Sequence, residues 1–134
     1  MYDEASITPI RPKSLRIKGL NRFTYFFTCK KIIEKTILEN KSDIILLYGV
    51  ATNGIQTIEI AKKLNVPVVF RVLDVAHDLV TNPILRKKAK NYEKYVLKNS
   101  DQILATTPQL SKYAIEMGSS KEKTSSFPLG INAK

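Results

Sequence analysis

The feature that most constrains the fold is a repeated change in the spacing of the apolar residues. Stretches with the three-to-four-residue spacing of a helix alternate with short runs rich in Val, Ile and Leu. Helices are predicted over residues 22–39, 53–64, 83–98 and 108–117, and strands over residues 43–48, 66–72, 101–105 and 127–129. This alternation predicts an α/β fold, a Rossmann-like open parallel sheet with helices on both faces.

The first predicted strand is apolar at every position from residue 44 to residue 48. Alternating polarity would indicate one wet face, so a continuous apolar run predicts a strand that is covered on both faces. In such sheets, ligands bind outside the carboxyl ends of the strands. The segments predicted at that edge are residues 49–53, 73–82 and 106–109.

Composition narrows the class of protein further. The 134 residues include 22 Lys and Arg against 12 Asp and Glu, a formal charge of +10 that suits nucleic acid, an anionic membrane or phosphorylated ligands. One Cys and one His exclude a disulfide framework, a Cys-rich zinc module and any site that needs two histidines. The acidic start, residues 1–4, and the lack of a long apolar run predict a cytoplasmic protein without signal peptide or membrane span.

The segment from residue 73 to residue 82 holds the richest set of polar side chains. Asp74 and Asp78 lie on either side of His77, directly after a predicted buried strand. One interpretation is a ligand loop in which His77 donates a hydrogen bond or transfers a proton. The other is a helix-start loop in which a carboxylate caps backbone amides and His77 packs in the core.

Two further turns lie at the same predicted edge. Asn53 belongs to a turn of small residues, whose free amides at a helix start could bind a phosphate or a sugar hydroxyl. A plain turn is the other interpretation, since neither a dinucleotide-binding glycine motif nor a P-loop is present. Thr107 precedes Pro108, and helix capping explains this pair completely.

The first predicted helix combines aromatic and basic residues. Phe23, Tyr25, Lys30 and Lys31 are the candidates for a peripheral contact with an anionic membrane, unless another segment covers the aromatics. The basic run 86–98 is interpreted by default as the solvated face of a helix, because no recognised nucleic-acid-binding module accompanies it.

Several short motifs together resemble a known family, the N-terminal, acceptor-side domain of family 4 retaining glycosyltransferases with the GT-B fold. In chain order they are the strand 43–48, Val66-Pro67 leading to His77-Asp78, Tyr92-Glu93-Lys94, Ser100-Asp101-Gln102-Ile103, Thr106-Thr107-Pro108, Gly118 and the segment 127–132. Leu129 departs from the family pattern, which has asparagine there, and the loop before His77 is longer than usual.

The resemblance implies roles for individual residues. His77 matches the family histidine at the cleft between the two domains, which contacts the transferred sugar or the acceptor, and Asp78 accompanies it. Thr107 stands where the family often has serine. Asn53 and Asp74 are expected to be secondary substrate contacts.

The resemblance also implies an activity. A nucleotide-sugar would donate a hexosyl group to a lipid-linked or saccharide acceptor, with retention and without a metal or another cofactor. Residues 1–21 would be an irregular basic lead segment and residues 22–134 a partial Rossmann-like domain. The donor domain would lie outside the chain, which would be inactive alone.

Two other function classes are weighed against this expectation. The first is a non-catalytic basic α/β module that binds nucleic acid or an anionic membrane. The second, a dinucleotide-binding oxidoreductase, is disfavoured by the missing glycine motif. A membrane contact at the inner face of the cell membrane is compatible with a role in polysaccharide or glycolipid biosynthesis.

Overall fold

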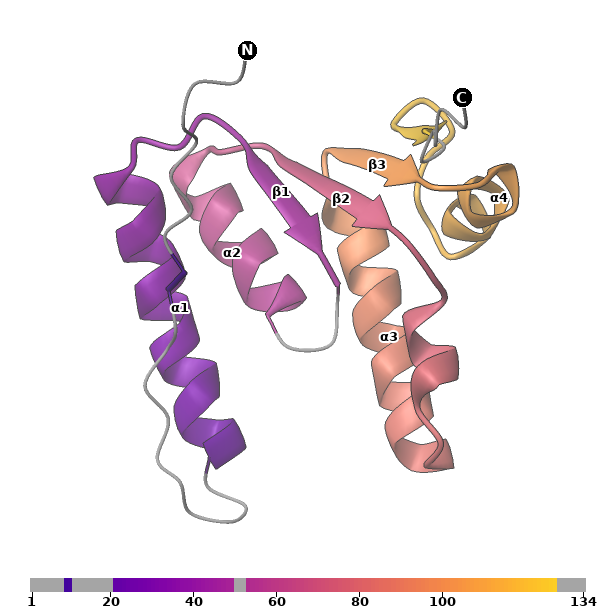
Figure 1. The fold of residues 1–134 in the computed structure, drawn as a ribbon, viewed down its shortest axis with the longest axis horizontal. Coiled ribbons are helices and arrows are strands. Elements are labelled where there is room, and N and C mark those ends of the chain that lie inside the picture. Colours follow the sequence, from indigo (N-terminus) through magenta and orange to yellow (C-terminus); the bar gives the residue numbers. More distant parts are fainter. Residues whose placement is uncertain (1–8, 11–20, 50–52, 128–134) are drawn as a thin grey trace, which may run out of the picture.

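The computed structural model describes residues 9–10, 21–49 and 53–127, with backbone alone for residues 21–27. The helices are α1 (Asn21–Glu39), α2 (Gly54–Leu64), α3 (Pro83–Asn99) and α4 (Pro108–Glu116), with a short 3-10 helix η1 (Ala76–Leu79). The strands are β1 (Ile45–Tyr48), β2 (Val68–Val72), β3 (Gln102–Ala105) and β4 (Thr124–Ser126) (Figure 1).

The strands form one parallel sheet in the order β1-β2-β3-β4. Leu47 pairs with Phe70, Phe70 pairs with Ile103, and Ile103 pairs with Thr124, so these residues share one face of the sheet. The predicted fold class, a Rossmann-like open parallel α/β sheet, is confirmed.

The core lies between the sheet and one layer of helices. Leu47, Phe70 and Ile103 of the sheet pack in a single buried cluster with residues of α2, α3 and α4. Right-handed crossovers between strands in sequential order place all the connecting helices on the same face, which explains why these three helices share one core.

The opposite face of the sheet differs from the prediction for the first strand. Ile44, Leu46 and Tyr48 are 59%, 51% and 53% exposed, so within the described part of the chain β1 is covered on one face. The reason is topological, because α2, α3 and α4 all lie on the other side and β1 is an edge strand. The second helical layer that the apolar run predicts is not among the described residues.

The predicted helix starts agree with the structure at two of the strand-to-helix turns. The Asn82 side chain accepts hydrogen bonds from two amides at the start of α3, and Thr107 accepts one at the start of α4. Gly118, after α4, has the positive φ of 109° that favours glycine. Asn53 occupies the capping position of α2 but makes no side-chain capping bond.

The last strand that the structure describes, Thr124–Ser126, begins before the predicted strand 127–129, of which residues 128 and 129 lie outside the described residues. The ladder explains the shift, because Ile103 N–H donates to Lys123 O and Phe127 N–H donates to Ala105 O, which places the polar residues between them in the sheet. An edge strand tolerates polar side chains because it is partly in solvent.

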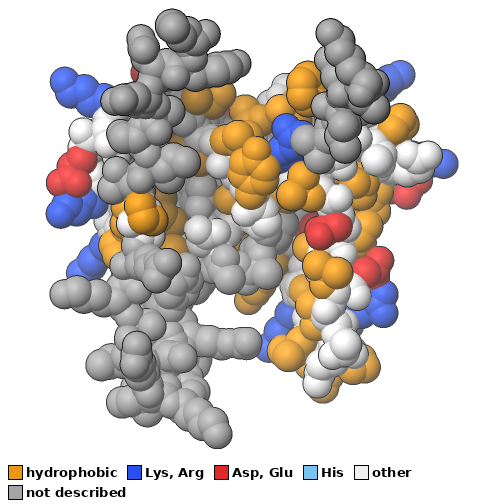
Figure 2. Space-filling view, in the orientation of Figure 1, with side chains coloured by type: hydrophobic (Ala, Val, Ile, Leu, Met, Phe, Trp, Pro, Cys, Tyr) orange, Lys and Arg blue, Asp and Glu red, His pale blue; other side chains and the backbone are white. Residues whose placement is uncertain are grey.

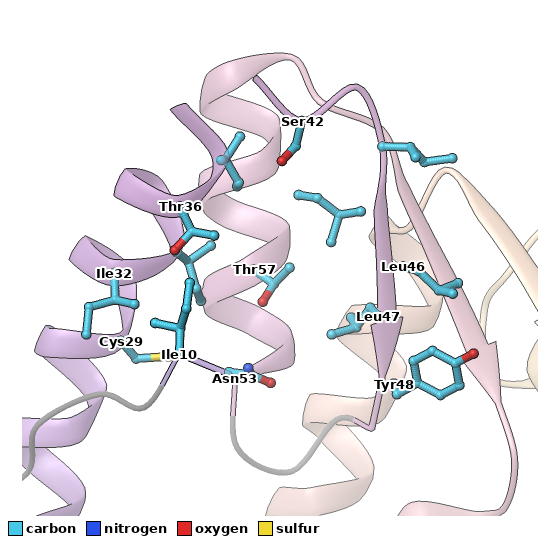
Figure 3. A pocket seen from close by; sticks show the side chains of 14 residues that line it. Ile10, Cys29, Ile32, Thr36, Ser42, Leu46, Leu47, Tyr48, Asn53 and Thr57 are labelled. Atoms are coloured by element: carbon cyan, nitrogen blue, oxygen red, sulfur yellow. The ribbon is translucent and has the colours of Figure 1, made fainter. Parts of the chain in front are cut away.

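Helix α1 packs beside α2, and two ion pairs join the two helices. Lys30 Nζ lies 2.5 Å from Glu59 Oε2, and Lys63 Nζ lies 2.6 Å from Glu34 Oε1. A hollow of about 540 Å³ lies between α1, β1 and the start of α2 (Figure 3). No helix in the described ranges is both long and apolar enough to span a membrane.

Candidate functional site

The candidate site lies at the carboxyl edge of the sheet, where the chain leaves β2. After Val72 the chain turns into η1, which contains His77 and Asp78. Helix α3 packs against η1, and α4 begins at the same edge after β3. Three segments that are distant in the sequence therefore meet around His77, whose side chain is only 10% exposed.

Glu93, in the middle of α3, holds this loop in place. It is 1% exposed, and its Oε2 lies 2.8 Å from His77 Nδ1. The same carboxylate accepts the backbone N–H of Ala76 at 3.2 Å and that of His77 at 3.3 Å. One buried side chain thus fixes both the backbone of η1 and the ring of the histidine.

Tyr113 closes the cluster from α4. Its hydroxyl lies 3.2 Å from His77 Nδ1, and the two rings are stacked with centroids 6.3 Å apart. Burial raises the pKa of Tyr113 well above its usual value, and the charge of Glu93 and a hydrogen bond to Glu93 raise it further. The tyrosine is therefore a neutral hydrogen-bond donor at physiological pH.

Asp78 lies on the solvent side of the histidine. Its Oδ1 is 3.6 Å from His77 Nε2, and the Arg86 guanidinium donates a hydrogen bond to the same oxygen. That hydrogen bond lowers the pKa of Asp78, and the charges of Arg86, His77 and Lys90 act in the same direction. An ionised carboxylate paired with arginine thus borders the outer nitrogen of the ring.

The structure separates the other predicted substrate contacts from this cluster. Asp74 is exposed and makes no hydrogen bond or ion pair with a described residue. Thr107 Oγ1 accepts the Leu110 N–H at 3.2 Å, the capping role expected from its sequence. Asn53 lines the hollow of Figure 3, at the start of α2 and next to Ile10. Of the predicted residues, His77 and Asp78 are brought together.

The residues predicted for a membrane contact lie on α1. The side chains of Phe23 and Tyr25 lie outside the described residues. Lys30 is engaged with Glu59 of α2, while Lys31 is exposed. The membrane contact through these residues stays a prediction.

Sequence reasoning did not assign Glu93 and Tyr113 to the site. A usable signal was present, because Glu93 is an acidic residue on the inward face of its helix, three and four positions before Val96 and Leu97. A carboxylate placed in the core needs a hydrogen-bonded partner. Tyr113 lies on the predicted apolar stripe of its helix, where a phenol with its hydroxyl buried also needs one.

The cluster suits hydrogen bonding and proton transfer. No group of three or more His, Cys, Asp or Glu side chains in the part of the chain that the structure describes could hold a metal ion. The ring nitrogens of His77 are the hydrogen-bonding groups at the centre of the cluster, and the neighbours of the ring fix its orientation.

The fold defines a class, a Rossmann-like α/β domain, and the cluster lies at the edge of the sheet where such folds bind ligands. The family model described as Glycosyltransferase Family 4 matches residues 2–134, and the chain belongs to this family. The resemblance found in the sequence is thereby confirmed, and a glycosyltransferase type of function is supported. A search of curated proteins found no match.

Proposed function

We propose that the chain is the acceptor-side domain of a retaining glycosyltransferase. It would form one wall of a cleft in which a hexosyl group passes from a nucleotide-sugar to a hydroxyl of a lipid-linked or saccharide acceptor. The observation that carries this proposal is the buried His77–Glu93 pair, 2.8 Å apart, at the edge where such folds bind ligands. Membership of glycosyltransferase family 4 supports the reaction class.

In this proposal, His77 orients the reacting groups through Nε2, the nitrogen that faces away from Glu93. A ring held by neighbours on two helices is pre-organised, so little rotational freedom is lost when substrate binds. Asp78, held by Arg86, is placed to accept a hydrogen bond from a sugar hydroxyl beside the ring. Asp74, Asn53 and Thr107 remain proposed secondary contacts.

The proposal includes a donor-binding domain joined to this chain and no metal or other cofactor. It is tested with the chain alone and with the full-length protein that contains it, each incubated with a panel of nucleotide-sugars and hydroxyl acceptors. We expect that only the full-length protein transfers the sugar and that chelators do not inhibit the transfer. The product should retain the anomeric configuration of the donor. Transfer by neither protein with any donor would contradict the proposed reaction.

A specific observation supports contact with an anionic membrane as a second function. Leu79 at the end of η1 and Ile84 at the start of α3 are 71% and 73% exposed. Lys87 and Lys88, one turn further along, are exposed and form no ion pair with described residues. Figure 2 shows hydrophobic side chains at the lower end of α3 with Lys and Arg on either side. This combination is typical of peripheral membrane contacts.

Each basic side chain near an anionic leaflet contributes about 1 kcal/mol to binding, so a few of them with two apolar residues suffice for reversible attachment. Flotation with vesicles that contain phosphatidylserine, compared with neutral vesicles, tests this function. We expect binding to anionic vesicles that is weakened by Ile84→Ser with Lys87→Gln and unchanged by Lys121→Gln. Removal of the aromatics at Phe23 and Tyr25 tests the predicted contact on α1 in the same assay.

The alternative function, a basic module that binds nucleic acid, is tested by measuring the affinity of the same protein for duplex DNA. Affinity for duplex DNA that falls steeply with added salt would favour a basic binding module, because phosphate contacts release counterions. We expect no such affinity at physiological salt.

A further inference from the structure

We propose that Glu93 is a positioning residue that keeps a proton on Nδ1 of His77, so that Nε2 is the nitrogen that gains and loses a proton. The consequence for catalysis rests on the proposed function. The position of the proton itself is a property of the chain that can be measured without substrate.

The argument begins with the hydrogen-bond donors around Glu93. Its two oxygens accept the backbone N–H of Ala76 and that of His77, and its Oε2 also lies 2.8 Å from His77 Nδ1. An ionised carboxylate accepts all of these bonds because it has about four lone-pair sites and no proton to give. Every group that contacts Glu93 here is one that can donate.

The distance between Glu93 Oε2 and His77 Nδ1 then places the ring proton. At 2.8 Å a proton must lie between the two atoms, since two facing lone pairs at this separation would repel. With Glu93 as the acceptor of its neighbouring N–H groups, the proton belongs to Nδ1. The bond is charge-assisted, which makes it about twice as strong as a neutral one.

Tyr113 offers the competing arrangement. Its hydroxyl lies 3.2 Å from Nδ1 and could donate to that nitrogen if the ring proton were on Nε2. That arrangement replaces the shorter, charge-assisted bond with a longer, neutral one, and it leaves Oε2 and Nδ1 as two facing acceptors. The geometry therefore favours Glu93, and not Tyr113, as the partner that fixes the position of the ring proton.

The outer nitrogen is left available by this arrangement. His77 Nε2 lies 3.6 Å from Asp78 Oδ1, beyond ordinary hydrogen-bond distance, and Arg86 holds that oxygen. The neutral ring presents a lone pair at Nε2 that can accept a hydrogen bond from a substrate hydroxyl. The charged groups beside the ring are Glu93 from α3, Asp78 from η1 and Arg86 from α3.

The test is the imidazole ¹H–¹⁵N spectrum of the folded chain at a pH about two units above the ordinary histidine pKa. The chain has a single histidine, so the spectrum contains one imidazole and needs no assignment. We expect Nδ1 to show the shift of a protonated nitrogen and Nε2 that of a nitrogen with a free lone pair. The reverse pattern in the wild type would overturn the proposal, whether or not any variant folds.

Two variants separate positioning by Glu93 from positioning by Tyr113. Glu93→Gln replaces an acceptor with an amide whose N–H can donate to Nδ1, so the population with the proton on Nε2 should rise. Tyr113→Phe keeps the carboxylate and should leave the proton on Nδ1. A folded Glu93→Gln chain that keeps the Nδ1 proton, or a Tyr113→Phe chain that loses it, would overturn the assignment.

Activity is measured separately in the full-length protein. Glu93→Gln should lower kcat by about tenfold to a hundredfold and shift its pH profile, as for partners that orient functional histidines in other sites. Glu116→Gln, an exposed acidic position on α4, is the matched control and should change neither. If the spectra agree and no transfer is detected in the wild type, the proposed function fails while the positioning by Glu93 stands.

Discussion

Replacing Glu93 with alanine should destabilise the fold strongly. The change removes the acceptor of the Ala76 and His77 amides and of His77 Nδ1. A buried donor without a partner costs about 1–3 kcal/mol, with the higher figure for bonds to charged groups. The two amide bonds are long, at 3.2 and 3.3 Å, and water can enter the space left by the side chain. The loss of each amide bond should therefore cost closer to about 1 kcal/mol than to about 3 kcal/mol.

We therefore expect Glu93→Ala to lower the free energy of unfolding by about 3–5 kcal/mol, because three buried N–H donors lose their acceptor. This is a large part of the roughly 5–15 kcal/mol that stabilises a typical domain. Glu93→Gln keeps the volume and one acceptor oxygen, so about half of that loss is expected. Urea unfolding followed by circular dichroism measures both, provided that the slope with denaturant is unchanged.

The matched control is Glu116→Gln on the exposed side of α4, where the carboxylate lies 4.0 Å from Lys112. An exposed pair of this kind contributes little, so the change should stay within about 0.5 kcal/mol. A loss below about 1 kcal/mol for Glu93→Ala would refute the reasoning, since the donors around Glu93 would then have other partners.

Three smaller predictions concern single groups. The raised pKa of Tyr113 stabilises the fold below pH 10.0, and this contribution is lost as the pH rises above that value. The urea midpoint of Tyr113→Phe should therefore fall less steeply in alkali than that of the wild type, and equal falls would contradict this. The lowered pKa of Asp78 stabilises the fold above pH 3.8, and this contribution is lost as the pH falls below that value. The difference in urea midpoint between the wild type and Asp78→Asn should therefore shrink in acid, and a constant difference would count against the ion pair with Arg86. Thr107→Ala should cost about 1 kcal/mol in thermal unfolding and Thr107→Ser much less, because the hydroxyl caps α4; equal losses would exclude capping.

Much of the fold could be predicted because each cue was local. Pro83 located the start of α3, Thr107 followed by Pro108 located the start of α4, and Gly118 located the end of α4. The covering of β1 could not be predicted from its apolar run, because it depends on which strands and helices surround it. The position of β4 was also missed, since its polar residues are selected by pairing with β3 and not by their own hydropathy.

Only part of the candidate site could be predicted from the sequence. His77 and Asp78 were found because they follow a buried strand, and position alone suggests a ligand edge. Glu93 and Tyr113 were missed because their contacts with His77 span 16 and 36 residues, and only tertiary packing brings them together. Helical spacing placed Tyr113 on the inward face of its helix but did not indicate its partner, and Glu93 was counted within the basic run 86–98 that was interpreted as a solvated face.

The most direct test of the central claim is the turnover of the full-length protein with His77→Ala. Transfer from a nucleotide-sugar to a hydroxyl acceptor is measured for the wild type, for His77→Ala and for the exposed control Lys121→Ala, with folding checked by circular dichroism. We predict that His77→Ala lowers kcat/KM by about a hundredfold or more, the usual contribution of a positioned acid–base group, and that Lys121→Ala does not. A folded His77→Ala protein with wild-type turnover would contradict the assignment of this edge as the reacting wall of the cleft.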